Sequence, residues 1–215
     1  MKENEVSEVV IKRLPRYYRY LGELMKKNIT RISSKGLSDM LGFTASQIRQ
    51  DLNCFGGFGQ QGYGYNVEML YRKIGDILGL NRGYKAVIIG AGYLGHALAC
   101  YNGFAKRGFS VIGIFDIDKK IIGTRIGELT VKDYSTLEKF IDDNKPDIAM
   151  LTVPKSAVND VAVKLTSVGI KALWNFAYVD LSLPDDVVVE NVHLSDSLMN
   201  LSYRLTAIKN KGEKL

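Results

Sequence analysis

Three glycines within one short segment could hold a phosphate group against the protein backbone. Directly after the apolar run 86–89 the sequence reads Gly90-Ala91-Gly92-Tyr93-Leu94-Gly95. In a strand–turn–helix unit the first glycine makes the turn, the second lets backbone amides approach a pyrophosphate, and the third allows close helix–strand packing. The first amides of the helix have no partner within it and suit phosphate oxygens. This segment, with Tyr93 and Leu94, is a candidate dinucleotide-binding turn.

An acidic residue stands where the next strand is expected to end. The second expected strand, Ser110 to Phe115, is followed by Asp116, 21 residues after Gly95. A carboxylate at this place accepts hydrogen bonds from the adenosine ribose and repels a 2′-phosphate. The pattern favours NAD(H) over NADP(H), although Lys119 and Lys120 nearby temper that preference.

Strand and helix patterns alternate through the rest of this half. Strands are expected at 147–153, 171–176 and 187–192, and helices around 135–144 and 157–169. The alternation predicts an α/β fold over residues 84–193, a Rossmann-like doubly wound parallel sheet of five or six strands. Ligands of such sheets bind at the carboxyl ends of the strands. Residues at these strand ends are therefore candidate contacts, although ordinary packing of strand ends explains their types equally well. The candidate contacts for the nicotinamide half are Thr152, Val153, Pro154, Asn175, Phe176 and Ala177.

The net charge of the chain lies entirely in its first part. Residues 1–85 carry 14 Lys and Arg against 8 Asp and Glu, whereas residues 86–215 carry 15 of each. A basic surface favours a polyanionic partner, because binding releases counterions condensed on phosphate. The alternative is a soluble domain whose excess of positive charge has no role in binding.

The basic part has the pattern of a winged helix over residues 1–80. Apolar residues three or four apart predict an amphipathic helix over 6–27, with a break or kink at Pro15 and a second helix beginning near it. A short helix is expected behind a Ser33/Ser34 cap, followed by the turn Gly42-Phe43. Thr44 then opens a third helix with Gln47 three residues later, as in a capping box.

The third helix has the composition of a recognition helix. Ala45, Ile48 and Leu52 are expected to face inward. Arginine can bridge the two major-groove acceptors of guanine, and glutamine can pair with adenine, although any solvated helix face can look similar. The residues expected to face outward are Ser46, Gln47, Arg49, Gln50 and Asn53.

Glycines and aromatic residues alternate between positions 55 and 65. This pattern suits a tight hairpin with aromatic anchors, in the position of a wing. Gln60, Gln61 and Tyr63 are its candidate DNA contacts, and the Gln pair brings no charge to the tip. Residues 79–83 are the expected hinge between the two parts.

The last segment, 194–215, begins with an amphipathic helix to about residue 210. It carries one apolar stripe, made of Leu194, Leu198, Leu201, Leu205 and Ile208. Such a helix docks on its own domain or on a second subunit, and a dimer suits a DNA reader that needs two half-sites.

Other classes of protein fit the sequence less well. The two cysteines and two histidines have no metal-ligand spacing, and no apolar run resembles a signal peptide or membrane span, so a cytoplasmic protein without metal is expected. None of the 12 tyrosines has a lysine four residues later, as short-chain dehydrogenases require, so no enzyme is expected. Two alternatives stay open: a small dehydrogenase, and a CoA- or nucleotide-binding module whose basic half binds a protein.

Several segments carry a resemblance to a known family. Besides the glycine turn they are 13–21 (RLPRYYRYL), 47–52 (QIRQDL), 55–66, 101–104 (YNGF), 115–118 (FDID), 151–154 (LTVP) and 175–177 (NFA). With these segments the sequence resembles the Rex family of redox-sensing transcriptional repressors over essentially its whole length.

The resemblance implies a homodimer whose C-terminal helices are exchanged between subunits. It implies binding of a palindromic, A·T-rich operator when the protein is free or holds NAD+, and release when NADH binds. It also implies that Tyr101 lies near the nicotinamide and changes partners between the two states. Arg19 would stabilise the DNA-binding state through an acidic residue of the other subunit, where the last helix begins.

The sequence departs from the family pattern at three places. The acidic position aligns with His193, just before Leu194, and Asp196 one turn later is an alternative partner for Arg19. The wing has Gln60-Gln61 where relatives often have basic residues. Tyr178 replaces the proline that usually follows Asn-Phe-Ala.

Overall fold

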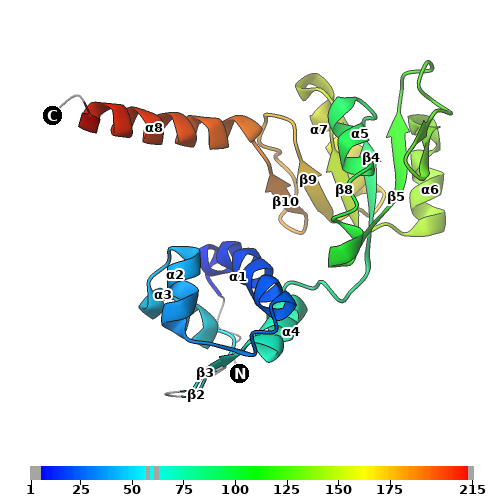
Figure 1. Cartoon of the computed structure of the whole chain (residues 1–215). Helices are drawn as coiled ribbons and strands as arrows, with labels where there is room; N and C mark the ends of the chain where they lie inside the picture. Colours follow the sequence, from blue (N-terminus) through cyan, green and yellow to red (C-terminus); the bar gives the residue numbers. More distant parts are fainter. Residues whose placement is uncertain (1–5, 57–58, 61–62, 213–215) are drawn as a thin grey trace. The chain divides into compact units, whose positions relative to one another are not determined.

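The computed structural model describes residues 6–56, 59–60 and 63–212. The chain divides into two compact units, Met1–Arg82 (unit 1) and Gly83–Leu215 (unit 2). Figure 1 shows unit 1 in blue to cyan and unit 2 in green to red.

Unit 1 is a winged-helix domain with four helices and one small sheet among its described residues. The sheet is antiparallel, with strand order β1-β3-β2. The elements are α1 (Glu8–Lys26), β1 (Arg31–Ile32), α2 (Ser34–Leu41), α3 (Ala45–Asn53), β2 (Gly59–Gln60), β3 (Gly64–Asn66) and α4 (Val67–Ile77).

Side-chain caps define where three of these helices begin. The Ser33 hydroxyl accepts a hydrogen bond from the Gly36 amide before α2, and the Thr44 hydroxyl accepts one from the Gln47 amide before α3. Asn66 caps α4 in the same way. Each cap satisfies an amide that has no partner within its helix, and the expected starts at Ser33 and Thr44 are confirmed.

Of the break or kink expected at Pro15, the break and the second helix beginning near it are wrong, because α1 is assigned as one helix from Glu8 to Lys26. Proline removes one hydrogen bond, the one that residue 15 would donate to the carbonyl of Ile11. Both residues are exposed, so water can satisfy that carbonyl. Leu14, Tyr17 and Leu21 are each at most 1% exposed, and their burial in the core of unit 1 outweighs the lost bond.

Unit 2 contains a seven-stranded sheet in the order β10-β9-β8-β4-β5-β7-β6. Every pair is parallel except β6 with β7. The strands are β4 (Tyr84–Ile89), β5 (Phe109–Asp116), β6 (Arg125–Ile126), β7 (Leu129–Asp133), β8 (Ile148–Leu151), β9 (Ala172–Asn175) and β10 (Val188–Asn191). The helices are α5 (Tyr93–Ala99), α6 (Leu137–Asn144), α7 (Lys155–Ser167) and α8 (Leu194–Gly212), with short 3-10 turns η1 (Ala105–Arg107) and η2 (Tyr134–Thr136).

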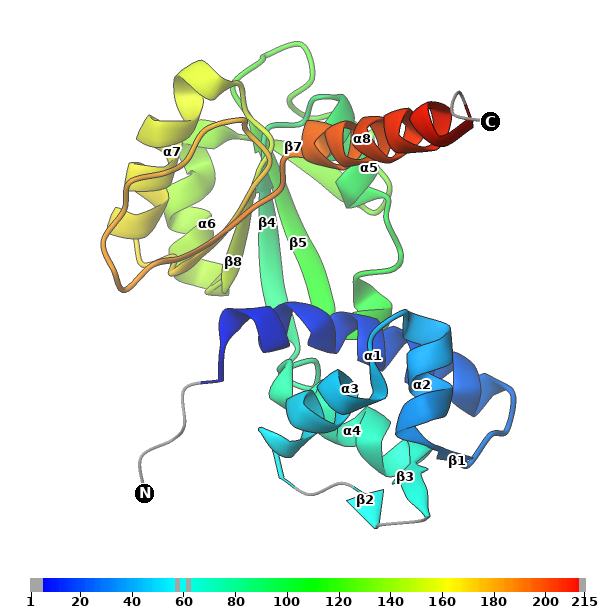
Figure 2. The same ribbon diagram turned by 90° about the vertical axis from the view of Figure 1, so that its left-hand side faces the viewer.

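Helices cover both faces of this sheet, as in a doubly wound fold. Alternate residues of β4 separate the two sides: Val87 and Ile89 pack with α6 and α7, whereas Ala86 and Ile88 pack with α5. Figure 2 shows α6 and α7 on one side of β4 and β8, and α5 on the other. The Rossmann-like parallel sheet expected from the sequence is confirmed.

The sheet has one antiparallel edge strand that the sequence pattern did not indicate. The expectation was five or six parallel strands, but β6 and β7 form a hairpin at the edge, with Ile126 opposite Leu129. Strand β6 is two residues long, too short to show an alternating pattern.

Helix α8 is exposed from residue 194 to residue 210 in the single chain. The stripe expected to be apolar is exposed by 64% at Leu194, 61% at Leu201 and 68% at Ile208. Figure 1 draws it as one continuous helix at the end of unit 2. Within residues 6–56, 59–60 and 63–212, no helix combines the length and apolar character needed to cross a membrane.

Candidate functional site

The glycine turn after β4 is built so that no side chain fits at two of its positions. A Cβ atom on Gly95 would lie 2.0 Å from the Gly90 carbonyl oxygen, and one on Gly90 would lie 2.7 Å from the carbonyl oxygen of Thr152. Gly90 also has φ +102°, which L side chains rarely adopt. The Thr152 hydroxyl donates to the Gly90 carbonyl at 2.7 Å, so the ends of β4 and β8 are joined at this turn.

The middle glycine lies against open space. A Cβ atom on Gly92 would meet nothing within 4 Å. Helix α5 begins directly after it without a side-chain cap, and Tyr93 is fully exposed. Amides with no partner in a helix therefore face an open surface, an arrangement that suits an anion. Leu94 is half-buried beside them.

Asp116 holds the glycine turn in place. One carboxylate oxygen accepts a hydrogen bond from the Ala91 amide at 2.7 Å. The other accepts from the amides of Ile117 and Asp118, at 2.7 and 2.9 Å. An ionised carboxylate has about four acceptor positions, so capacity remains for a ribose hydroxyl. The contact with Ala91 is a role that the sequence analysis missed, since strand-end spacing carries no information on it.

The candidate residues at the ends of β8 and β9 lie at the level of the glycine turn. Ile89 pairs with Leu151, and Leu151 pairs with Asn175, so the three strands end together. Thr152, Val153 and Phe176 are half-buried, and Pro154, the residue before α7, is exposed. The structure therefore brings these candidates together around the carboxyl end of the sheet, where α/β folds bind ligands.

Asn175 differs from its neighbours, because its polar atoms are already paired. It is fully buried, and its amide nitrogen donates to the Val179 carbonyl and to the Asn191 side chain, each at 2.8 Å. Its side-chain oxygen accepts from the amide of Ala177, which is also buried. Asn175 thus shapes the 176–179 loop and has no donor left for a ligand.

Aromatic rings form a chain from Tyr101 to the end of β9. Phe104 packs edge-on against Tyr101 (ring centroids 4.8 Å apart) and against Trp174 (5.6 Å). Trp174 in turn contacts Phe176 at 4.6 Å. The Tyr101 ring, 53% exposed as a residue, lies over Gly103, where a Cβ atom would be 2.4 Å from it. This chain supplies an apolar wall.

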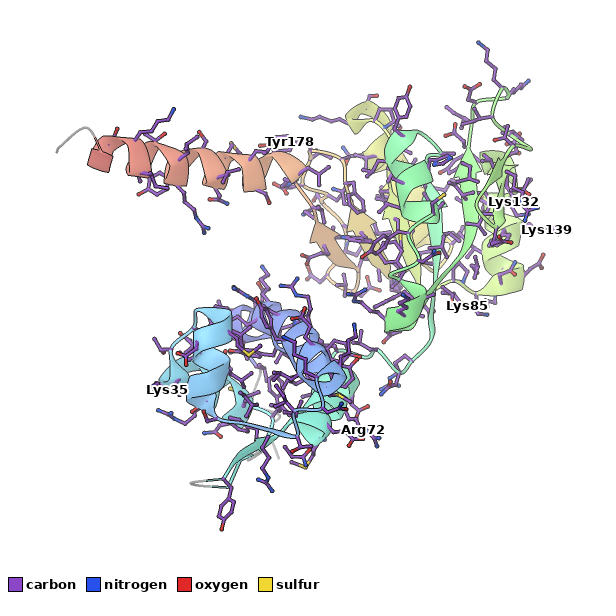
Figure 3. All side chains as sticks on the ribbon, viewed as in Figure 1. Lys35, Arg72, Lys85, Lys132, Lys139 and Tyr178 are labelled. Carbon is purple, nitrogen blue, oxygen red and sulfur yellow. The ribbon has the colours of Figure 1, made fainter. Side chains whose placement is uncertain are left out.

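Two cavities lie away from this arrangement. The first, of about 600 Å³, is at the opposite ends of β8 and β9, next to Asp147 and Lys171. The second, of about 370 Å³, is lined by Lys132 and Lys139, which Figure 3 labels beside α6. Neither includes the glycine turn. Among the described residues, no group of three or more His, Cys, Asp or Glu could hold a metal ion.

In unit 1, α3 presents the polar face expected of a recognition helix. Ser46, Arg49, Gln50 and Asn53 are exposed and Gln47 is half-buried, whereas Ile48 and Leu52 are buried. The Arg49 guanidinium donates to the Ser34 hydroxyl at 3.1 Å, so it is held near the start of α2.

The wing carries a charge that the sequence analysis did not assign to it. Arg31, on β1, donates to the Tyr63 carbonyl at 3.2 Å, and its guanidinium lies 5.9 Å from the centre of the Tyr63 ring. Tyr63 is 69% exposed. Gln60 lies on β2, and Gln61 is outside the described residues. Strand β1 is two residues long and gives no pattern that could have linked Arg31 to the hairpin.

A buried charged residue on α3 was also missed. Asp51 is 1% exposed and binds Arg13 and Tyr17 of α1. The signal was present, because position 51 follows the buried Ile48 by three residues and therefore lies next to it on the helix surface.

The candidate switch residues lie on both units and are described separately. Arg19, on α1, is exposed and lies over the Tyr20 ring at 5.6 Å. His193 is half-buried before α8, 3.9 Å from the Asp180 carboxylate and edge-on to Tyr178 at 4.7 Å. Leu194 and Asp196 are exposed in the first turn of α8. Figure 3 labels Tyr178 near the start of that helix.

Two family models match the chain, one on each unit. Residues 5–53 match "Putative DNA-binding protein N-terminus", and residues 81–179 match "CoA binding domain".

Relatives match over nearly the whole length. The redox-sensing transcriptional repressor Rex of Thermoanaerobacter pseudethanolicus is 57% identical over 95% of this chain and 91% of its own. That of Clostridioides difficile is 57% identical over 92% of this chain and 94% of its own. The Rex-family repressor RSP, solved with β-NAD+ and operator DNA, has a TM-score of 0.90 and 55% identity over 97% and 96% of the two chains. RSP solved with β-NADH also has a TM-score of 0.90, with 51% identity over 99% and 100%.

Proposed function

The chain belongs to the Rex family of redox-sensing transcriptional repressors, and from this premise we propose how its own residues carry out sensing and repression. Unit 1 binds operator DNA, unit 2 binds NAD+ or NADH, and NADH releases the DNA. The observation that carries the proposal is the glycine turn, where packing forbids side chains at Gly90 and Gly95 while Gly92 faces open space. The protein is a sensor and not an enzyme, as its relatives are repressors.

The residues at the strand ends of unit 2 fit a nicotinamide dinucleotide. The backbone amides after Gly92 donate hydrogen bonds to the pyrophosphate. The Asp116 carboxylate accepts hydrogen bonds from backbone amides and still has acceptor positions for the hydroxyl groups of the adenosine ribose. Thr152, Val153 and Pro154, with Phe176 and Ala177, line the nicotinamide side, and Asn175 holds their loop in shape.

The aromatic chain explains a preference for the reduced cofactor. The nicotinamide ring of NAD+ is positively charged, whereas that of NADH is neutral. Burial of an unpaired charge against apolar groups is costly, so the wall that begins at Tyr101 and Phe104 favours NADH. A change from 99% DNA-competent to 99% released needs a ratio of affinities of about 10⁴ between the two states, roughly 5.5 kcal/mol. Two sites in a dimer can share this requirement.

Unit 1 reads DNA through α3 and holds the backbone through the wing. Arg49, Gln50 and Asn53 are the base-reading candidates, with Ser46 and Gln47 at the start of the helix. Tyr63 and the basic Arg31 place the wing against phosphates. Gln60 and Gln61 remain candidate DNA contacts.

We further propose that the protein is a homodimer in the cytoplasm, joined by exchange of α8. The helix exposes Leu194, Leu198, Leu201, Leu205 and Ile208 on one stripe, and such an apolar surface is rarely left uncovered in a monomer. The domains proposed are residues 1–80 for DNA, 84–193 for the dinucleotide and 194–215 for the exchanged helix. Analytical ultracentrifugation tests this: the chain sediments as a dimer and Leu201→Glu as a monomer, and a monomeric wild type overturns it.

Asp196 is the acidic partner proposed for Arg19 in the DNA-binding state. His193 is already in contact with Tyr178 and near Asp180, whereas the Asp196 side chain is exposed at the start of α8. Asp196→Asn therefore weakens operator binding as much as Arg19→Gln, and the double variant is no weaker than either. His193→Gln, measured in the same assay, tests the alternative that His193 is the partner of Arg19. If only that variant loses the operator, His193 takes the role.

One titration tests the function as a whole. Fluorescence anisotropy follows a palindromic, A·T-rich duplex bound by the protein while NADH, NAD+ or CoA is added separately. Release by NADH alone is expected. Equal DNA binding with saturating NADH and NAD+ overturns the redox proposal, and release by CoA identifies a nucleotide module of another kind.

A further inference from the structure

A buried ionic network joins α3 to α1. Asp51 accepts hydrogen bonds from both Nε and Nη2 of Arg13, each at 2.7 Å, and from the Tyr17 hydroxyl at 2.6 Å. Asp51 and Tyr17 are each 1% exposed. Three donors thus converge on one carboxylate inside the core of unit 1.

Both donors to Asp51 have a raised pKa. Burial and the hydrogen bond to Asp51 raise the pKa of Tyr17, so its hydroxyl keeps the proton that it donates. The hydrogen bond to Asp51 likewise raises the pKa of Arg13. Tyr17 and Arg13 therefore act as donors to Asp51 in this network.

A second contact joins the same stretch of α1 to the beginning of α3. Phe43, in the turn before α3, packs edge-on against Tyr17 with ring centroids 6.0 Å apart. The guanidinium of Arg16 lies 4.9 Å from the centre of the Phe43 ring, and that of Arg13 lies 5.9 Å from it. Residues 13–17 therefore hold α3 at two points, Phe43 before its first turn and Asp51 near its end. Two points define the direction of a helix.

A buried ionic network of this kind sets the orientation of the helix that it holds more reliably than it stabilises the fold. A buried ion pair loses so much hydration that apolar residues of similar size often replace it without loss of stability. A bidentate arginine–carboxylate pair, however, has a fixed geometry that apolar packing does not impose. Arg49 precedes Asp51 by two residues, about 200° around the helix, so holding Asp51 inward directs Arg49 outward.

We propose that Arg13, Tyr17 and Asp51 are positioning residues that set the angle at which α3 meets the base edges, and thereby determine discrimination between operator and other DNA. The inference rests on the proposed function, in which α3 reads the operator. General affinity for DNA comes from the exposed basic surface and does not depend on this network. Loss of the network therefore lowers operator affinity while affinity for unrelated DNA stays the same.

The test compares operator affinity with affinity for a scrambled duplex of equal length at one salt concentration. Asp51→Asn lowers operator affinity about tenfold, the loss expected for one mismatched base pair. Its affinity for the scrambled duplex stays within about twofold of the wild-type value. Glu68→Gln is the matched control, because it removes one negative charge and an exposed ion pair with Arg72 in the same unit. It leaves the ratio of the two affinities unchanged.

An apolar replacement of the whole network separates orientation from folding. The combined variant Arg13→Met, Tyr17→Phe, Asp51→Leu regains the thermal stability that Asp51→Asn loses, but not the operator preference. If operator preference returns together with stability, the network only holds the fold, and the inference is overturned. The same holds if Asp51→Asn weakens both duplexes equally.

The two proposals fail in different ways. A wild-type protein without operator preference contradicts the proposed function. A wild-type protein that prefers the operator, with variants that keep this preference, contradicts only the positioning role. NADH binding by unit 2, measured on every variant, stays at the wild-type value.

Discussion

In the proposed sites, the glycine turn of unit 2 offers backbone groups to its ligand, whereas α3 of unit 1 offers side chains to DNA. The glycine turn is held by packing so close that a Cβ atom on Gly95 would lie 2.0 Å from the Gly90 carbonyl oxygen. The face of α3 is instead held from behind, through Asp51 and Phe43. A backbone site is thus sensitive to any added atom, while a side-chain site is sensitive to lost polar groups.

The strongest test of this comparison is Gly95→Ala. The turn must shift to admit the methyl group, at a cost of about 3 kcal/mol, and NADH affinity falls roughly 100-fold by isothermal titration calorimetry. Operator binding persists, so DNA is retained at NADH concentrations that release the wild type. Gly92→Ala is the companion, because its methyl group meets open space. Gly92→Ala leaves the melting temperature unchanged and lowers only the affinity for the cofactor. A normal NADH affinity for Gly95→Ala would contradict the conclusion that the turn has no room for a side chain.

Asp116→Ala tests a side chain that supports the backbone of the glycine turn. It removes the acceptor of the Ala91 amide and the proposed acceptor of the ribose. NADH affinity falls about 30-fold, as expected for hydrogen bonds to a charged group, and discrimination against NADPH is reduced. Asp118→Asn is the control, since the Asp118 carboxylate accepts a hydrogen bond from the nearby Lys120 amide and not from the glycine turn. Unchanged titrations with both cofactors would remove Asp116 from the site.

Arg49→Ala tests the side-chain site in unit 1. Operator affinity falls about tenfold, because one bidentate base contact is worth about 1 to 3 kcal/mol, and NADH binding is unaffected. Lys35→Ala, on α2 (Figure 3), removes the same charge from an exposed position. It weakens operator and scrambled duplexes equally, whereas Arg49→Ala weakens mainly the operator. Equal behaviour of the two variants would make Arg49 a phosphate contact.

The smallest effect is expected at the wing. Arg31→Ala lowers affinity about threefold for every duplex, and the slope of log affinity against log salt decreases by about 1, as for loss of one phosphate contact. Arg31→Lys keeps the charge and restores most of the slope. A change in sequence preference instead would show that the wing reads bases.

Local signals explain why much of this fold and site could be predicted. The caps at Ser33 and Thr44 involve residues three apart, and the glycine turn lies within six residues. Such features depend on chain geometry over a few residues, so their residue types state them directly. The alternation of strands and helices in unit 2 is likewise visible, because buried parallel strands are apolar throughout.

The errors and omissions concern features that depend on tertiary contacts and not on local sequence. Pro15 should interrupt a helix by its local geometry, but the burial of Leu14 and Tyr17 on either side keeps α1 continuous. Strand β6, which closes the edge hairpin with β7, is only two residues long and shows no pattern. The roles of Arg31 and Asp51 depend on partners 32 and 38 residues away in the sequence.

The sequence by itself determined the two units, the glycine turn, the acidic residue Asp116 and the polar face of α3, because each depends on residues that are close together along the chain. Only the tertiary structure decided that Asp116 supports the Ala91 amide, that Asn175 has no free donor, and that Asp51 connects α3 to α1. These roles arise from hydrogen bonds between distant segments. Their partners become neighbours only when burial of apolar surface brings the segments together.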